Sequence, residues 1–252
     1  MTKTMMKMLG VAGLLLAAGA VQAELAEYVD EGGEIRTNTT FSVVTAATAQ
    51  LTNGWYLVEG TVRRGEIDVA AGCTAHLILA DGASLTVLGG FRKAGIDVSS
   101  GEELVIYGQR NGTGRLSVNG GAYAAGIGGY SKAVGRIRIC GGTVTAEGGQ
   151  YGAGIGCGYA GLGGEVVISG GRVNAIAGRS ASCVGRGLPQ ESACSVAISG
   201  GVFAHEPEID WLADGYGVFA NPDPTTCADY PYVVLSYKGR EKGRMHGGVY
   251  TE

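Results

Sequence analysis

The segment Ala124-Ala-Gly-Ile-Gly-Gly129 occurs three times in the chain in recognisable form. It returns as Gly152-Ala-Gly-Ile-Gly-Cys157 and, with changes, as Ala181-Ser-Cys-Val-Gly-Arg186, so that the first residues lie 28 and 29 positions apart. A sequence period of this size is typical of solenoids, in which each repeat covers the apolar face of its neighbour. The period therefore predicts a stack of similar coils. The inward apolar ladder of this stack is expected to contain Ile127, Ile155 and Val184.

A second repeated unit follows each copy of this segment. Residues 136–146, 165–175 and 195–205 share a strand-like run, a Gly-Gly pair and another strand-like run, and they recur with nearly the same period as the glycine segment. Apolar residues alternate with others in these runs, as at Ile137 and Ile139. This alternation indicates β-strands that turn one face inward.

The upstream half keeps the period but changes the residues. Ile67 and Ile96 lie 29 positions apart in similar Ile-Asp-Val segments. Between Arg115 and Arg136 a strand-and-corner unit recurs well before a full period is complete, which predicts one short coil or a change of register near Gly120.

Together the repeats predict an all-β fold, a right-handed parallel β-helix with coils of about 29 residues. We expect this helix over 51–205, after a polar N-terminal segment at 24–50 and before a C-terminal cap or connector at 206–252. Trp55 and its neighbour are expected to cover the first coil, and a strand at 230–237 is expected either to cover the last coil or to begin a further unit. Such covers protect the exposed strand edges at the ends of a solenoid.

Residues 1–23 have the features of a secretory signal peptide. Lys3 and Lys7 precede an apolar stretch, and Val21-Gln-Ala23 offers small residues before a cleavage point. The apolar stretch is shorter than the roughly 20 residues that a membrane-spanning helix needs. We therefore expect a mature protein that is secreted, periplasmic or at the cell surface and that has no membrane span.

Composition narrows the classes of partner. Removal of the first 23 residues takes the formal net charge from −4 to −6, which argues against a nucleic-acid-binding surface. The chain has 47 glycines among 252 residues, far above the usual glycine share of about 7%. We expect these glycines in tight turns and close backbone contacts. The oligomeric state stays open.

The cysteines and histidines predict disulfides rather than a metal site. The six cysteines allow 15 pairings in an exported chain, and the pairing stays open, although Cys183 and Cys194 flank a short loop and form the favoured local pair. The three histidines lie far apart, so no metal site is expected. The cysteines are Cys73, Cys140, Cys157, Cys183, Cys194 and Cys227.

The glycine-rich repeats do not predict a cofactor. The segment Gly156-Cys-Gly-Tyr-Ala-Gly161 satisfies a dinucleotide-binding pattern, but a strand rather than a helix is expected after it. Calcium-binding glycine repeats need an aspartate that is missing from every copy here.

Two carboxylates occupy matching places in successive coils. Asp68 and Asp97 would lie one strand spacing apart, and paired carboxylates of this kind suit a polysaccharide lyase or glycoside hydrolase. The alternative is an outward polar row without catalysis, which we favour because no further acidic or basic residue matches these positions. We therefore expect no enzyme activity and keep the polysaccharide-cleaving enzyme as the second reading.

Four tyrosines flank the repeated glycine segment and form our candidate binding site. Tyr123 and Tyr151 precede two of its copies, and Tyr130 and Tyr159 follow them. Rings in a row can stack on the apolar faces of sugars, or can stabilise the pairing of coils by about 0.2–1 kcal/mol per pair.

The run from Trp55 to Phe203 resembles the glycine-rich repeats of secreted or surface proteins of bacteria, many of them adhesin-like. The resemblance rests on the Gly-Ala-Gly-Ile-Gly segment, the Ile-Ser-Gly-Gly-Arg-Val corner and residues 78–87. It implies a parallel β-helix outside the cytoplasm. With the tyrosines, it predicts a non-enzymatic binding or structural protein with a polysaccharide or cell-surface glycan as its partner; a spacer without a ligand is a further alternative.

Overall fold

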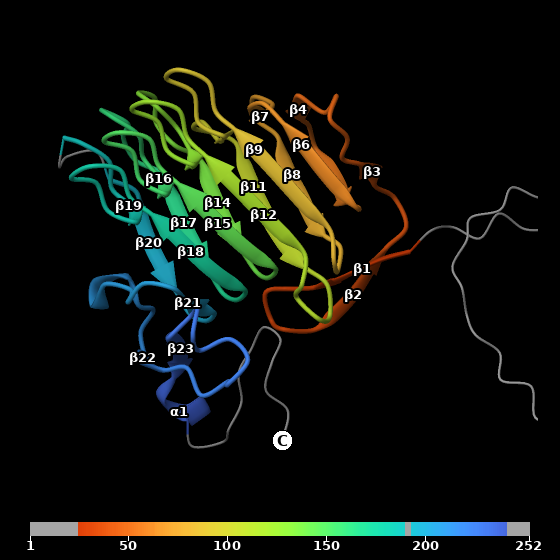
Figure 1. The fold of residues 1–252 in the computed structure, drawn as a ribbon, viewed down its shortest axis with the longest axis vertical. Helices are drawn as coiled ribbons and strands as arrows, with labels where there is room; N and C mark the ends of the chain where they lie inside the picture. Colours follow the sequence, from red (N-terminus) through yellow and green to blue (C-terminus); the bar gives the residue numbers. More distant parts are fainter. Residues whose placement is uncertain (1–24, 190–192, 241–252) are drawn as a thin grey trace, which may run out of the picture.

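The computed structural model describes residues 25–189 and 193–240 and shows an all-β protein (Figure 1). The helices in these residues are a 3-10 helix, η1 (Ile209–Trp211), and one short α-helix, α1 (Tyr237–Arg240). Strands of successive coils lie side by side in three parallel sheets, so the predicted parallel β-helix is confirmed. The predicted signal peptide at 1–23 lies outside the described residues.

Each coil contributes one strand to each sheet in turn. The short-strand sheet contains, in spatial order, β4 (Gln50–Leu51), β7 (Ile67–Val69), β10 (Ile96–Asp97), β13 (Ile127–Gly128), β16 (Ile155–Gly156) and β19 (Val184–Gly185). The hairpin-side sheet contains β3 (Ser42–Val43), β5 (Gly54–Val58), β8 (Thr74–Leu79), β11 (Glu103–Gly108), β14 (Arg136–Ile139), β17 (Glu165–Ile168) and β20 (Ser195–Ile198). The cap-side sheet contains β6 (Thr61–Arg64), β9 (Ser84–Leu88), β12 (Arg115–Asn119), β15 (Thr143–Glu147), β18 (Arg172–Ile176) and β21 (Val202–Phe203).

Stacked apolar side chains fill the inside of the coils. In the short-strand sheet Ile127 pairs with Ile155, and Ile155 pairs with Val184, in parallel register. All three are buried in one continuous core that runs through the stack. The predicted inward ladder is therefore confirmed, and Ile67 and Ile96 extend it upstream.

The prediction of a short coil or a change of register near Gly120 is wrong. Arg115 pairs with Thr143, one full coil later, on the cap-side sheet. Arg136 lies on the hairpin-side sheet, where it pairs with Glu103. Arg115 and Arg136 therefore belong to strands of two different sheets, and the interval between them is not a coil length. The stack continues without a short coil at Gly120.

The N-terminal segment packs on the side of the solenoid. The antiparallel strands β1 (Ala26–Val29) and β2 (Ile35–Asn38) form a hairpin, whose residue Ala26 packs against Leu57 and Ile78 in a second core. Trp55 belongs to this outer cluster, 4.3 Å from the ring of His76. The expectation that Trp55 and its neighbour cover the first coil is wrong for Trp55, whose side chain lies on the outward face of β5, whereas its neighbour Tyr56 packs against the inner core.

The C-terminal segment covers the last strand of the cap-side sheet. β23 (Tyr232–Ser236) pairs antiparallel with β21, and β22 (Tyr216–Ala220) pairs with β23. This hairpin and α1 lie at the lower end of the stack in Figure 1. The predicted covering strand at 230–237 is confirmed within the described residues.

Glycines stack where one coil approaches the next. A Cβ at Gly149 would lie 1.9 Å from the backbone oxygen of Gly121, and a Cβ at Gly121 would lie 1.6 Å from the backbone oxygen of Gly90. Backbone atoms cannot move aside as a side-chain tip can, so any larger residue must push two coils apart.

Gly149→Ala is expected to lower the free energy of unfolding by about 1–3 kcal/mol, because the added methyl meets fixed backbone. Gly65→Ala is the control, since a Cβ there meets no atom within 4 Å, and it should change stability by less than about 0.5 kcal/mol. Urea denaturation of both variants measures the difference. Equal stability of the two variants would show that the coils are not in contact at Gly149.

Candidate functional site

Four successive coils turn the same corner before the short-strand sheet. In each, the backbone N–H of the fourth turn residue donates to the carbonyl oxygen of the first, as from Ala124 to Gly121 at 3.0 Å and from Gly152 to Gly149 at 2.9 Å. The third residue of each turn has a left-handed backbone, which is uncommon outside glycine. These third residues are Arg92 (φ 57°), Tyr123 (φ 69°), Tyr151 (φ 68°) and Ser180 (φ 60°).

A second turn follows the short strands and returns to these corners. The backbone N–H of Tyr159 donates to the carbonyl oxygen of Tyr123 at 2.7 Å, and that of Leu188 donates to the carbonyl oxygen of Tyr151 at 3.1 Å. The first bond fixes the backbone of Tyr159, and the second that of Leu188, against the corner of the preceding coil. The two kinds of turn therefore bring residues before and after the glycine segment onto one flank.

Three tyrosine rings form a cluster on this flank. The ring centroids of Tyr123 and Tyr151 are 5.7 Å apart, those of Tyr123 and Tyr159 are 5.9 Å apart, and those of Tyr151 and Tyr159 are 6.2 Å apart. The rings are tilted or edge-on to one another rather than stacked flat. Tyr159 is 42% exposed.

Arg92 connects the fourth predicted tyrosine to this cluster. Its guanidinium carbon lies 5.8 Å from the ring centroids of both Tyr123 and Tyr130, and 5.1 Å from that of Phe91. These distances fit cation–π contacts. We call the set Phe91, Arg92, Tyr123, Tyr130, Tyr151 and Tyr159 the tyrosine flank.

The structure thus brings all four predicted tyrosines together, and it adds two residues that the sequence did not reveal. Phe91 and Arg92 occupy the corner one coil before that of Tyr123, where Gly90 takes the place of Gly121 as the first turn residue. A comparison of turns rather than of glycine segments could have found them. Phe91 is 72% exposed.

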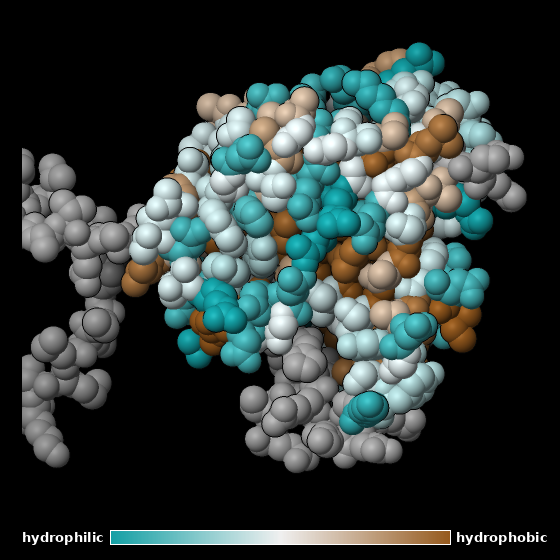
Figure 2. Space-filling model, turned by 180° about the vertical axis from the view of Figure 1, so that it is seen from behind, coloured by the Kyte–Doolittle hydropathy of each residue, from teal (hydrophilic) through white to brown (hydrophobic). Residues whose placement is uncertain are grey.

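Hydrophobic residues also occur elsewhere on the surface. Seen from behind, the molecule carries several hydrophobic patches among hydrophilic residues (Figure 2). Exposure alone therefore does not define a site.

The predicted carboxylate pair is present in the short-strand sheet. Asp68 and Asp97 are partners in parallel register, which confirms that they lie one strand spacing apart. Ser99 Oγ donates to Asp97 Oδ1 at 2.8 Å, and its backbone N–H donates to Glu102 Oε2 at 2.6 Å.

Burial is the main influence on the pKa values of Asp97 and Glu102. It raises the pKa of Asp97, helped by the charge of Asp68 and opposed by the hydrogen bond from Ser99. Burial likewise raises the pKa of Glu102. Raised pKa values of this kind occur in catalytic acids. They also occur in carboxyl clusters that have only a structural role.

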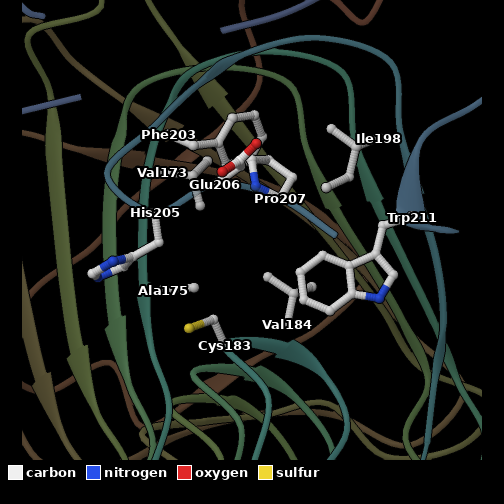
Figure 3. A pocket seen from close by; sticks show the side chains of 10 residues that line it. All are labelled: Val173, Ala175, Cys183, Val184, Ile198, Phe203, His205, Glu206, Pro207 and Trp211. Carbon is white, nitrogen blue, oxygen red and sulfur yellow. The ribbon is translucent and has the colours of Figure 1, made fainter. Parts of the chain in front are cut away.

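A small apolar cavity lies at the end of the stack, under the segment that follows β21. The ring of Trp211 lies on one side of it, and Cys183 and His205 lie on the other (Figure 3). Apolar side chains make up most of the lining. The cavity lacks the converging polar groups of a typical ligand pocket, and we assign no site to it.

The favoured pairing of Cys183 with Cys194 is not formed in this structure. All six cysteines are free thiols in this structure, and the sulfur that contacts Cys194 Sγ is Cys157 Sγ, at 3.0 Å. Cys183 lines the end cavity instead. Cys183 packs against the same core as Cys194, but the sulfur in contact with Cys194 is that of Cys157.

The described residues contain neither a cluster of metal ligands nor a membrane-spanning helix. No group of three or more histidine, cysteine, aspartate or glutamate side chains there is arranged to hold a metal ion. None of the helices in residues 25–189 and 193–240 has the length and apolar character needed to cross a membrane.

Comparison of the chain with protein-family models, with curated proteins and with solved structures finds no match. The resemblance to glycine-rich repeats of bacterial surface proteins therefore stays a prediction. The function must be argued from the geometry of the chain itself.

Asp97→Asn is expected to stabilise the fold at pH 7. The raised pKa means that the folded chain binds this proton more tightly than the unfolded chain does, so the charged carboxylate costs stability above the folded pKa. The cost disappears as the pH falls below the ordinary value of 3.8. The advantage of the variant over the wild type should disappear with it.

Urea denaturation of both proteins between pH 7 and about pH 3.5 measures this difference. Asparagine keeps an oxygen that can accept from Ser99 Oγ, so the variant is matched in its hydrogen bonds. A variant that is less stable than the wild type at pH 7 would contradict the assignment of burial as the main influence.

Proposed function

We propose that this protein is an exported binding module that holds glycans on the tyrosine flank. The observation that carries the proposal is the gathering of four tyrosines and one arginine on one flank of a regular stack. Each corner turn presents its third residue in the same way, so the flank repeats with the coils. A repeating polymer such as a polysaccharide suits a repeating surface.

The chemistry of the flank fits a sugar. A tyrosine ring has an apolar face and a polar hydroxyl, so it can stack on the C–H face of a sugar ring and donate or accept a hydrogen bond at its edge. The guanidinium of Arg92 offers several N–H donors in a plane. Sugar hydroxyls and carboxylates can accept from such donors.

Packing alone explains only part of this arrangement. Contacts between Tyr123 and Tyr151 join successive coils and contribute to stability. The exposed rings of Phe91 and Tyr159 contribute much less to the core. Contiguous exposed aromatic rings are typical of interaction surfaces.

The left-handed backbone of the corner residues supports the same proposal. Non-glycine residues in this conformation cost about 1 kcal/mol or more each, and such residues cluster at functional sites. Glycine would avoid the cost, yet Arg92, Tyr123 and Tyr151 occupy these corners. A role for the side chains of these three residues accounts for their presence, whereas Ser180 has the same backbone at the fourth corner outside the tyrosine flank.

Export is the second part of the proposal. It is supported by the signal-like features of residues 1–23 and by the resemblance to bacterial surface repeats. We propose that the mature protein is secreted, periplasmic or attached to the cell surface.

The second candidate function is cleavage of a polysaccharide by Asp68 and Asp97. The observation that favours it is their pairing across adjacent coils together with the raised pKa of Asp97. Assays for reducing ends and for unsaturated products over a panel of polysaccharides test it. Turnover that Asp97→Asn abolishes would replace our preferred function with this one.

Tyr159→Ala is expected to weaken glycan binding about tenfold, which corresponds to the loss of about 1.4 kcal/mol of ring contact. A glycan array with the mature protein identifies the ligand, and titration calorimetry measures the affinity. Tyr237→Ala is the control, because this exposed tyrosine lies in α1, outside the tyrosine flank. Absence of binding by the wild type, or equal binding by both variants, would contradict the proposal.

A further inference from the structure

We propose that Cys157 and Cys194 form a disulfide bond in the exported protein, and that this bond fastens the turn of Tyr159 to the next coil. The inference goes beyond glycan binding, since it concerns a covalent modification and does not require a ligand. It requires an oxidising compartment, as the proposed export supplies.

The backbone brings the two cysteines together. Cys157 directly follows β16, and Cys194 directly precedes β20. Both backbone N–H groups donate to the same carbonyl oxygen, that of Gly185, at 3.2 Å each. The strands and this shared acceptor therefore fix both residues, whatever the state of their sulfurs.

The side chains complete the arrangement. The two sulfurs lie 3.0 Å apart, and both residues are buried in the continuous core of the stack. A disulfide needs an approach of about 1 Å more, which small rotations of the two side chains can provide. No other pair of sulfurs is in such contact in the described part of the chain.

Three further cysteines have other neighbours. Cys140 belongs to the outer core under the N-terminal hairpin, and Cys183 lines the end cavity. Cys73 contacts the backbone oxygen of Ala71 at 3.8 Å. The structure thus selects one of the pairings that the sequence leaves open.

The two thiols differ in acidity. The hydrogen bond between the two sulfurs lowers the pKa of the Cys157 thiol and raises the pKa of the Cys194 thiol. A thiolate, rather than a thiol, attacks a disulfide.

Bond formation then follows the usual exchange. The thiolate of one of the two cysteines attacks a disulfide oxidant, such as oxidised glutathione or a thiol oxidase, and one thiolate leaves. The deprotonated sulfur of the other cysteine then attacks the first sulfur in the mixed disulfide, and the second thiolate leaves. The protein loses two electrons and two protons, and the oxidant becomes two thiols. Because both sulfurs are buried in the folded chain, the exchange takes place while the chain folds.

The bond encloses the segment that carries the outer edge of the tyrosine flank. The turn with Tyr159 follows Cys157 directly, and its next residue, Ala160, donates to the backbone oxygen of Leu188 at 2.6 Å. Arg186 and Ala193 pair as an antiparallel bridge just before Cys194. A bond at both ends of this segment reduces the conformational freedom of the unfolded chain.

Peptide mapping tests the inference on mature protein folded in a mixture of reduced and oxidised glutathione. After blocking of free thiols and digestion without reductant, we expect a cross-linked peptide that joins residues 157 and 194 and is lighter by two hydrogens. A Cys183–Cys194 peptide would overturn the proposal. Blocked thiols at both 157 and 194 would overturn it as well.

Thermal unfolding gives an independent readout. Reductant should lower the Tm of the wild type by about 5–15 °C, as expected for a typical disulfide. Cys157→Ala/Cys194→Ala should lose this response to reductant, whereas the control Cys140→Ala should keep it. The comparison with and without reductant separates the bond from any packing effect of the substitutions. An unchanged response in the double variant would overturn the proposal.

Discussion

The parallel pairing of each coil with the next is the constraint on which the rest of the structure depends. Backbone hydrogen bonds between equivalent strands hold the coils at the normal strand spacing of about 4.8 Å. Residues at equivalent positions of successive coils therefore lie next to each other. Ile127 pairs with Ile155 in the core, and the backbone of Gly121 lies close to Gly149 at the corner. Apolar burial and close backbone approach are two consequences of the same register.

The tyrosine flank is a third consequence. A left-handed residue at each corner points its side chain in a repeated direction, so that Tyr123 and Tyr151 stand in one row. The turn after the short strand adds Tyr159 to this row through a backbone hydrogen bond. A surface is thus built from residues that are far apart in the sequence but equivalent, or nearly so, in the coil. The scaffold fixes their backbone, which reduces the entropy that binding would otherwise cost.

The sequence predicted those features that depend on repeated residue patterns. The coil length and the inward ladder followed from the glycine segments, and the pairing of Asp68 with Asp97 followed from their matching places. The location of Trp55 did not, because both faces of β5 are apolar. Trp55 and Leu57 pack outward against the N-terminal hairpin, and Val58 packs inward. Alternation cannot distinguish an inner from an outer face in such a strand.

The candidate site was predicted in part for a similar reason. Four tyrosines could be found beside a repeated segment, but Phe91 and Arg92 stand in a coil where the residues of that segment are changed. Their place became visible only when the corner turns were compared. The contact between Cys157 and Cys194 depends on two strands that converge at Gly185, which no spacing in the sequence indicates. The identity of the ligand is likewise not contained in the repeats.

The central claim is that the tyrosine flank, and not the carboxylate pair, is the surface that holds a glycan. Nuclear magnetic resonance of mature protein with labelled tyrosine rings and labelled backbone amides tests this claim most directly, in a titration with the glycan that binds best. The account predicts shifts of the rings of Tyr123, Tyr130, Tyr151 and Tyr159, with little change at the amides of Asp68 and Asp97. Shifts centred on the two aspartates, with unchanged tyrosine rings, would contradict it.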